Sequence, residues 1–339
     1  MDGYAISGPV PIGAQLDVVG EAAAGHGFSG SIRPGQAVRI FTGAPVPDGA
    51  DRIVIQEDVS RDADTITVKD APGALAHVRP AGGDFQTGSE LSAPRRLKPS
   101  DIALLAAMNI ANVPVKKRPV VAIIPTGDEL VQPGEEPRPD QIIASNSYGL
   151  AALLEASGAE PRLLPIAHDT QAHLDLAFEL ATASDLIVTI GGASVGDHDL
   201  VGATAAARGL EQSFYKIAMR PGKPLMAGRL GSSMMIGLPG NPVSAMVCGH
   251  IFVAPVIRKM LGYSARPASR HTVKLAHDIG PNGPREHYMR ATQANGEVTI
   301  FDRQDSSLLT VLADANCLAV RAPHDPPRKA GENIDIVQL

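Results

Sequence analysis

Between Pro119 and about Tyr263 the sequence alternates short apolar runs with segments of helical periodicity. The apolar runs predict buried strands at 120–124, 163–166, 186–190 and 234–238, and helices are predicted at 146–156, 170–182 and about 241–261. Such alternation is typical of a mostly parallel sheet with helices on both faces. Ligands of such sheets bind beyond the carboxyl ends of the strands, so we expect the functional site in the loops there.

The segments on either side of this region have a different pattern. Residues 1 to about 86 hold short β-like runs, such as Ala37–Phe41 and Arg52–Ile55, separated by Pro and Gly. A short helix is expected near Pro99, with Ser100 as its N-cap, and the chain is β-like again from about Ser264. We therefore expect an α/β domain at 119–263, small β domains at 1–86 and 264–339, and a helical segment at 87–118.

Composition excludes several classes of protein. A formal net charge of −6 provides no basic surface for nucleic acid, and the absence of a run of about 18 apolar residues argues against a membrane span. The chain begins without the basic and apolar regions of a signal peptide. Its two cysteines, Cys248 and Cys317, lack metal-ligand spacing. We expect a cytoplasmic protein in which Cys248 fills space in the core.

A glycine-rich loop follows the apolar run 186–190 directly and contains Asp197 and Asp199. Small residues let a ligand approach the backbone, and carboxylates beside it can hold a divalent cation. The spacing Gly-Gly-x-x-x-Gly differs from the dinucleotide fingerprint. One interpretation is a tight turn before a helix, but the two acids favour a phosphorylated ligand with a metal ion.

Two further loops follow predicted strands and should open on the same edge of the sheet. The first holds Asp128 and Glu129, which are either simply solvated or ligands of Mg²⁺. The second runs from Pro239 to Ser244, with Asn241 as expected N-cap and Pro242 as the first helical residue. Its exposed helix N-terminus could bind an anion, although a purely structural turn explains the pattern equally well.

A cationic segment completes the candidate site. Lys216, Arg220 and Lys223 lie within eight residues, beside Pro and Gly. Such cations are often ordinary surface charges. Combined with the acidic loops, they predict a mixed site in which cations hold an oxyanion and carboxylates hold its metal.

Taken in this order, these segments resemble the molybdopterin molybdenumtransferases of the MoeA type, also found as the E domain of gephyrin. The likeness extends outside the α/β region, to Met1–Ala5, to Arg39–Ala44 and to Asp84 in Gly82–Phe85. It covers essentially the whole chain.

The resemblance implies the last step of molybdenum cofactor biosynthesis. Molybdenum from molybdate is inserted into adenylylated molybdopterin, and AMP is released with the help of Mg²⁺. It also implies an α/β domain of the three-layer molybdopterin-binding type, a homodimer, and transient contact with the molybdopterin adenylyltransferase and with apo-molybdoenzymes.

The resemblance assigns roles to particular positions. The pterin and phosphate positions are Gly191, Gly192, Ser194, Gly196, Asp197, Pro239, Gly240, Asn241 and Pro242. The acidic positions are Asp128, Glu129 and Asp199, with Glu129 and Asp199 as metal ligands. The positions that hold molybdate or phosphate are Lys216, Arg220, Lys223, Ser244, Arg290 and Ser306. The positions that act across the dimer are Asp2, Thr42 and Asp84.

Family members carry an elongated helical segment before the Asp-Gly-Tyr motif, and this sequence begins inside that motif. The resemblance therefore leaves only about 88–117 as the remnant of that elongated domain.

Two alternatives remain at this point. One is a molybdopterin adenylyltransferase, whose whole chain resembles only the α/β domain, so the flanking β domains argue against it. The other is a non-catalytic scaffold on the same fold.

Overall fold

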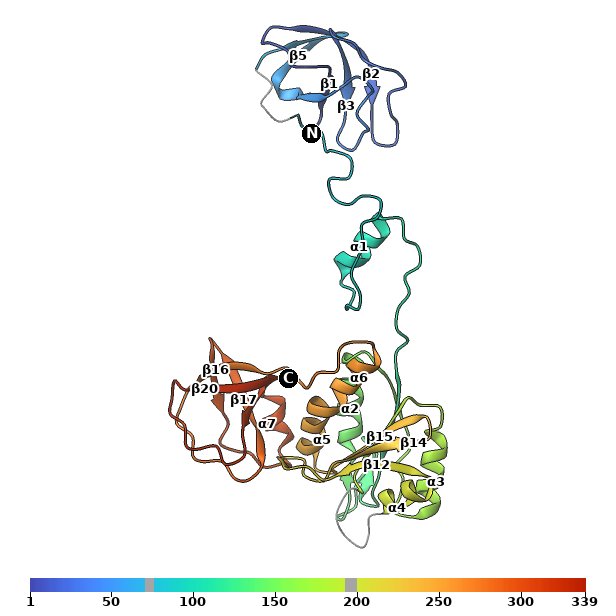
Figure 1. Cartoon of the computed structure of the whole chain (residues 1–339), viewed down its shortest axis with the longest axis vertical. Coiled ribbons are helices and arrows are strands. Elements are labelled where there is room, and N and C mark those ends of the chain that lie inside the picture. The colour runs from blue at the N-terminus through green and yellow to red at the C-terminus, as the bar shows by residue number, and fades with distance from the viewer. Residues whose placement is uncertain (71–75, 193–199) are drawn as a thin grey trace. The chain divides into compact units, whose positions relative to one another are not determined.

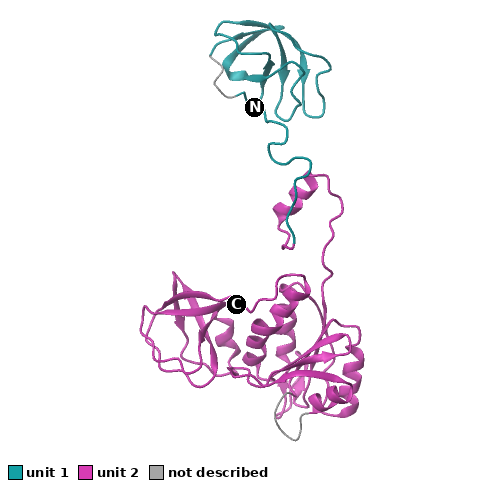
Figure 2. Ribbon diagram, viewed as in Figure 1, with its two compact units in different colours: residues 1–93 teal, residues 94–339 magenta. Residues whose placement is uncertain are grey.

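The computed structural model describes residues 1–70, 76–192 and 200–339. The chain divides into two compact units, residues 1–93 and residues 94–339, which are coloured separately in Figure 2.

The first unit is a β domain. Its six strands are ordered β4-β1-β3-β2-β6-β5 in one sheet. The elements are β1 (Gly3–Ile6), β2 (Gln15–Ala22), β3 (Gln36–Ile40), β4 (Arg52–Ile55), the 3₁₀ turn η1 (Gln56–Asp58), β5 (Val59–Asp62) and β6 (Thr65–Val68). All pairs are antiparallel except β2 with β3. The alternating apolar residues of these strands, such as Ile6, Val54 and Ile66, form its buried core.

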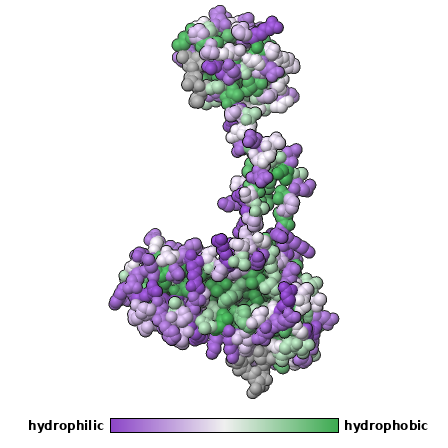
Figure 3. All heavy atoms as spheres, viewed as in Figure 1, coloured by the Kyte–Doolittle hydropathy of each residue, from purple (hydrophilic) through white to green (hydrophobic). Residues whose placement is uncertain are grey.

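The second unit opens with a short helix, α1 (Pro99–Ala107). The Asp101 carboxylate accepts a hydrogen bond from the Lys98 backbone N–H (2.8 Å) and pairs with Arg95 (2.9 Å). The expected N-cap Ser100 was wrong, because Pro99 already occupies the first helical turn and Lys98 is the cap. Apolar side chains gather around this helix in Figure 3, and Ile102 is half exposed.

A six-stranded α/β sheet follows, in the order β10-β7-β11-β15-β14-β12. Its strands are β7 (Val120–Pro125), β10 (Glu160–Leu163), β11 (Leu186–Ile190), β12 (Leu210–Tyr215), β14 (Met226–Leu230) and β15 (Ser233–Leu238). The first four of the order are parallel, and only β14 runs against the rest. A short pair, β8 (Leu130–Val131) and β9 (Ile142–Ile143), lies apart from this sheet.

Helices cover both faces of the sheet, as Figure 1 shows. Helices α3 (Gln171–Leu180) and α4 (Leu200–Ala207) enclose one core, which includes Ile124, Phe178 and Ile187. The other face carries α2 (Ser145–Ala156) and a continuous helical run of α5 (Pro242–Cys248), the π-helical turn η2 (Gly249–Val253) and α6 (Ala254–Met260). The expected three-layer, mostly parallel domain is confirmed, and Cys248 is buried in its core.

The helical run Pro242–Met260 is long and apolar enough to cross a membrane by length and composition alone. Half of it is buried inside the structure, where it packs on the sheet. A core helix has these same properties, so the run is only weak support for a span.

The remaining strands form a closed β barrel. They are β16 (His271–Leu275), β17 (Glu286–Ala294), β18 (Glu297–Ile300), β19 (Cys317–Arg321) and β20 (Asn333–Gln338), with the short helix α7 (Leu309–Ala313). The ring closes because β17 pairs with both β18 and β19. The strand β13 (Met219–Arg220), from the cationic segment, adds to β17 in parallel. Barrel residues Tyr288 and Leu318 share one core with α5, so barrel and α/β sheet pack together.

Two differences from the expected elements have physical causes. The strand expected at 163–166 lies at Glu160–Leu163, because Pro165 cannot donate to a ladder and ends the strand. The strands β12 and β14 were not expected at all, since their sequences lack a continuous apolar run.

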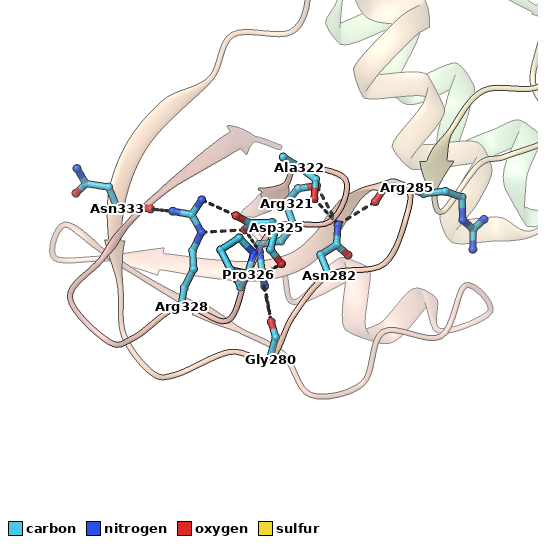
Figure 4. Close-up of polar contacts among 9 residues, drawn as sticks. All are labelled: Gly280, Asn282, Arg285, Arg321, Ala322, Asp325, Pro326, Arg328 and Asn333. Carbon is cyan, nitrogen blue, oxygen red and sulfur yellow. Dashed lines mark hydrogen bonds and ion pairs between the residues drawn. The ribbon is translucent and has the colours of Figure 1, made fainter.

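A buried ion network fixes two loops of the barrel (Figure 4). Asp325 pairs with Arg321 and with Arg328 (2.7 Å), and Arg321 also donates to the Gly280 carbonyl (3.1 Å). The Asn282 amide donates to the Arg285 carbonyl (2.9 Å) at the start of β17. The network therefore holds in place the end of β17 that receives β13.

Replacing Asp325 by Asn should lower the free energy of unfolding by about 3 kcal/mol, because it leaves the buried Arg321 and the partly exposed Arg328 without their counter-charge. Hydrogen bonds from Arg328 and Arg321 hold the pKa of Asp325 below its usual range. The stabilisation that Asp325 provides is therefore fully present when the pH is above the pKa of an aspartate in the unfolded chain. It is lost as the pH falls through the lower pKa that Asp325 has in the folded protein.

Urea unfolding at several pH values measures this effect. The matched control is Asp278→Asn, which removes the exposed ion pair with Lys329 and should leave stability nearly unchanged. Equal losses in the two variants would contradict the assignment.

Candidate functional site

The site lies at the carboxyl edge of the α/β sheet, where the loop after β7 carries two acids. Gly127 donates a hydrogen bond to the Ala167 carbonyl (3.1 Å), which ties this loop to the one after β10. The Asp128 carboxylate accepts a hydrogen bond from the Asp169 backbone N–H (3.0 Å) and lies 3.2 Å from His168 Nδ1. The Glu129 carboxylate folds back over Gly127, where only a residue without a Cβ leaves room for it. Asp128 is thus held at this edge, and the Glu129 carboxylate lies over Gly127 in the same loop.

The loop after β11 begins in close contact with its neighbours. The Gly191 N–H donates to the Leu238 carbonyl (3.1 Å), and a Cβ on Gly191 would lie 2.6 Å from the Thr126 carbonyl oxygen. Gly191 and Gly192 both have positive φ, of +94° and +63°. Glycine is required here because the backbones of three strand ends converge. The other predicted residues of this loop, Ser194, Gly196, Asp197 and Asp199, lie outside the described residues.

The turn from β15 to α5 connects three parts of the site. Asn241 is the N-cap residue and Pro242 the first helical residue, as expected. The Asn241 amide does not cap the helix but donates to Ser306 Oγ of the barrel (3.1 Å). The Val243 N–H donates to the Ser306 carbonyl (3.1 Å). The Asn146 amide at the start of α2 donates to the Gly240 carbonyl (2.7 Å), so Pro239 and Gly240 are fixed from the other side.

The cationic segment crosses the same edge between β12 and β14. The Ile217 N–H donates to the Lys223 carbonyl (3.1 Å), which closes a loop whose cations Lys216, Arg220 and Lys223 are all exposed. Gly222 has a φ of +107° and lies against the Cys248 sulfur of α5. Burial raises the pKa of Cys248 to about 12, so this thiol stays protonated and serves packing. The loop is therefore seated on α5 with its charges facing outward.

Arg290 is fully buried, yet its side chain is only partly hydrogen-bonded. Its Nη2 donates to the Asp305 carbonyl (2.8 Å), while Nε and Nη1 have no hydrogen-bond partner among the described residues. Burial lowers the pKa of this guanidinium, and nearby Arg220 lowers it further, against the opposing effect of Asp305. A buried cation with unpaired N–H groups is costly, which makes Arg290 a candidate to bind an anion.

The loop that bears Ser306 is fixed directly on Arg290. The Gln304 side chain accepts from the Arg290 backbone N–H (2.9 Å) and donates to the Arg290 carbonyl (2.9 Å). The Asp305 carboxylate accepts from the Ser307 N–H (2.8 Å) and hydroxyl (2.6 Å). Since Ser306 contacts the start of α5, Arg290 and the buried Ser244 belong to one neighbourhood.

His287 lies beside this cationic region, in register with Arg220 across β13 and β17. Burial lowers the pKa of His287 to about 4, assisted by Arg220 and Arg290, and its Nε2 has no hydrogen-bond partner in the part of the chain that the structure describes. The imidazole is therefore neutral at ordinary pH and adds no charge to the oxyanion region.

The acidic loop fits a magnesium ion by the chemistry of its donors. Mg²⁺ is commonly held by one or two carboxylates together with substrate phosphates. Asp128 and Glu129 supply such oxygens, although the described residues contain no cluster of three or more metal-ligating side chains.

The first unit holds the remaining predicted residues. The Asp2 carboxylate accepts hydrogen bonds from the Thr42 N–H and hydroxyl, both at 2.8 Å, and these bonds lower the pKa of Asp2. Asp84 is exposed and makes no described contact with that pair.

Several predicted residues are thus brought together, whereas other members of the site were missed by the sequence analysis. Asn146 could have been recognised from the sequence, because Ser-Asn-Ser opens the helix α2 at the edge of the site. Gln304 and His287 could not have been recognised in this way, because their roles arise from pairing between distant segments.

Family models match the chain in three parts. Residues 1–109 match the MoeA N-terminal region (domain I and II), residues 122–259 a probable molybdopterin binding domain, and residues 272–339 the MoeA C-terminal region (domain IV).

Relatives with known names match nearly the whole chain. The chain is 36% identical to a molybdopterin molybdenumtransferase of Nostoc sp., covering 100% of this chain and 82% of that protein. It is 34% identical to a protein of the same name from Haemophilus influenzae, covering 99% and 85%. A solved molybdopterin biosynthesis MoeA protein from Pyrococcus horikoshii has a TM-score of 0.83 at 27% identity, covering 100% of this chain and 86% of that chain.

Proposed function

The chain belongs to the molybdopterin molybdenumtransferase family, and from this we infer that it is an enzyme that inserts molybdenum into molybdopterin. We propose that its substrates are adenylylated molybdopterin and molybdate, and that AMP is the second product. The function is the last step of molybdenum cofactor biosynthesis. The adenylyltransferase alternative is not favoured, because the likeness covers the flanking β domains as well. The scaffold alternative is not favoured, because the relatives that match nearly the whole chain are named as transferases.

The observation that carries the proposal is the unpaired Nε and Nη1 of the buried Arg290. Molybdate is a dianion whose oxygens accept hydrogen bonds, and charge-assisted bonds from Arg are among the strongest available. Ser306 and Ser244 offer hydroxyl groups in the same neighbourhood. The exposed Arg220 and Lys223 attract the anion to the entrance of the site.

The acidic loop and the glycine-rich loop serve the other substrate in this proposal. Gly191 and Gly240 give a phosphate close access to the backbone, and Asp128 and Glu129 hold Mg²⁺ together with Asp199. The ion neutralises phosphate charge when it is bound. Asn241, at the edge of the sheet, is hydrogen-bonded to Ser306 of the barrel, so the loops that hold the two substrates belong to one rigid edge. Binding both substrates on this edge orients them for reaction and lowers the entropic cost of bringing them together.

The direct test is an assay of AMP release from adenylylated molybdopterin. We expect release that requires molybdate, stops when EDTA removes Mg²⁺ and resumes when the ion is restored. Adenylylation of molybdopterin by ATP would instead identify the adenylyltransferase alternative. A folded protein that neither binds nor turns over adenylylated molybdopterin would indicate the scaffold.

Replacing Arg290 by Met should raise the molybdate concentration for half-maximal activity by roughly 30-fold or more, because losing one partner of a buried charged hydrogen bond costs 2–5 kcal/mol. Protein stability should stay within about 1 kcal/mol of wild type, since the lost charge was incompletely paired.

The matched control is Arg303→Met, which changes an exposed Arg in the adjoining loop and should leave molybdate use unchanged. If Arg290→Met used molybdate as well as wild type, Arg290 would lie outside the oxyanion site.

We also propose a homodimer in which Asp2, Thr42 and Asp84 of one protomer complete the site of its partner. At a molybdate concentration too low for Arg290→Met to turn over, co-expressed Asp2→Asn and Arg290→Met chains should recover about a quarter of wild-type activity, because random pairing makes half of the dimers mixed and each holds a single complete site. No recovery, in mixed dimers isolated by two tags, would place these residues within one protomer's own site.

A further inference from the structure

The first residues of the chain are held by a side chain to which the site described above gives no role. Arg39, on β3, donates a hydrogen bond from Nη1 to the Gly3 carbonyl (3.2 Å) and one from Nη2 to Gln56 Oε1 (2.7 Å). The backbone N–H of the same Gln56 donates to the Asp2 carbonyl (3.1 Å). Two consecutive peptide carbonyls, those of Asp2 and Gly3, are therefore fixed by Arg39 and its partner Gln56.

The guanidinium group of Arg39 is itself held in one orientation. Arg39 lies directly opposite Tyr4 in the antiparallel pair of β1 and β3, and Phe41 follows β3 directly. The central carbon of the guanidinium is 5.0 Å from the centre of the Tyr4 ring and 4.7 Å from the centre of the Phe41 ring. Two cation–π contacts and two hydrogen bonds together leave this planar group little freedom.

The strand β1 does not need Arg39 to stay in its sheet. It is paired on both sides, with β3 and with β4, and a Cβ on Gly3 would lie only 2.2 Å from the Val54 carbonyl oxygen. Asp2 lies just before the strand, where this regular pairing has ended. We therefore expect the loss of Arg39 to change the orientation of Asp2 more than the stability of the sheet.

The Asp2 carboxylate has one oxygen occupied and one available. Its Oδ1 accepts both hydrogen bonds from Thr42, and within the described part of the chain no group donates to Oδ2. The hydrogen bonds from Thr42 are the largest cause of the lowered pKa of Asp2, and the charge of Arg39 is a smaller one. Arg39 therefore acts on Asp2 mainly through geometry, and Oδ2 is the atom that a substrate can reach.

We propose that Arg39 is a positioning residue of the reaction. Through the Gly3 carbonyl and Gln56 it holds the Asp2 carboxylate in the orientation that the substrate requires. The inference rests on the proposed function, in which Asp2 completes the site of a partner protomer. Arg39 itself does not contact the substrate, because both of its terminal nitrogens are used inside the first unit.

The experiment measures AMP release and the hydrogen exchange of the Thr42 amide in the full chain with Arg39→Met. We expect kcat to fall by roughly ten- to 100-fold, since misplacing a group of the site by about 1 Å costs up to about 100-fold. The KM for molybdate should stay unchanged, because the oxyanion site lies in the second unit. The Thr42 amide should exchange faster, because its hydrogen bond to Asp2 is loosened.

The variant Arg39→Lys separates geometry from charge. It keeps the positive charge but loses the planar group that stacks on two rings and donates to two acceptors, so it should behave like Arg39→Met.

Two further variants separate positioning from a general structural role. Gln56→Met removes the exposed partner of Arg39 but keeps the backbone bond to Asp2, so it should lower kcat by a smaller factor. In an Asp2→Asn background, Arg39→Met should have no further effect on the residual AMP release, because the carboxylate that it positions is already gone.

The matched control is Arg61→Met, which changes another arginine of the first unit, bonded only to the Ala63 carbonyl (2.8 Å) among the described residues, and should leave kcat and Thr42 exchange unchanged.

The proposal is overturned if Arg39→Met keeps the wild-type kcat or the wild-type Thr42 exchange rate, or if Arg39→Lys restores both. It is also overturned if Arg39→Met lowers the residual activity of Asp2→Asn by the same factor as in wild type, or if Arg61→Met has an equal effect. If wild type releases no AMP while Arg39→Met still speeds Thr42 exchange, the proposed reaction is contradicted but the positioning of Asp2 is not.

Discussion

The contact between the barrel and the first turn of α5 is the interaction on which the candidate site depends. Ser306 bonds to Asn241 through its hydroxyl and to the Val243 N–H through its carbonyl. The neighbouring Asp305 carbonyl holds Arg290. Through these bonds the carboxyl edge of the sheet, the helix N-terminus and a buried guanidinium become parts of one rigid unit. The strand β13, which pairs with β17, adds Arg220 to the same unit.

The division of charge across this edge gives each region a different ligand chemistry. Acids lie at the end of β7, cations lie between β12 and β14, and bare glycine backbone lies between them at the end of β11. A ligand that combines phosphates with a nearby oxyanion matches this order of surfaces.

The sequence alone was sufficient for the parallel strands β7, β11 and β15, because each is a buried apolar run followed by a loop that contains glycine. It placed β10 three residues too late, because that strand is not an apolar run. It also located the site loops, since parallel strands place them on one edge. It could not predict that β13 leaves the sheet to pair with β17, that Gln304 pins its loop to Arg290, or that Tyr148 faces β7 and β10. These features depend on contacts between distant segments, which local periodicity does not encode.

The most direct test is anomalous diffraction from crystals of the protein grown with molybdate. The account predicts a molybdenum peak within hydrogen-bond distance of Arg290 Nε and Nη1, with Ser306 or Ser244 as a further contact. A peak at the acidic loop that leaves Arg290 unpaired would contradict the assignment of the oxyanion site.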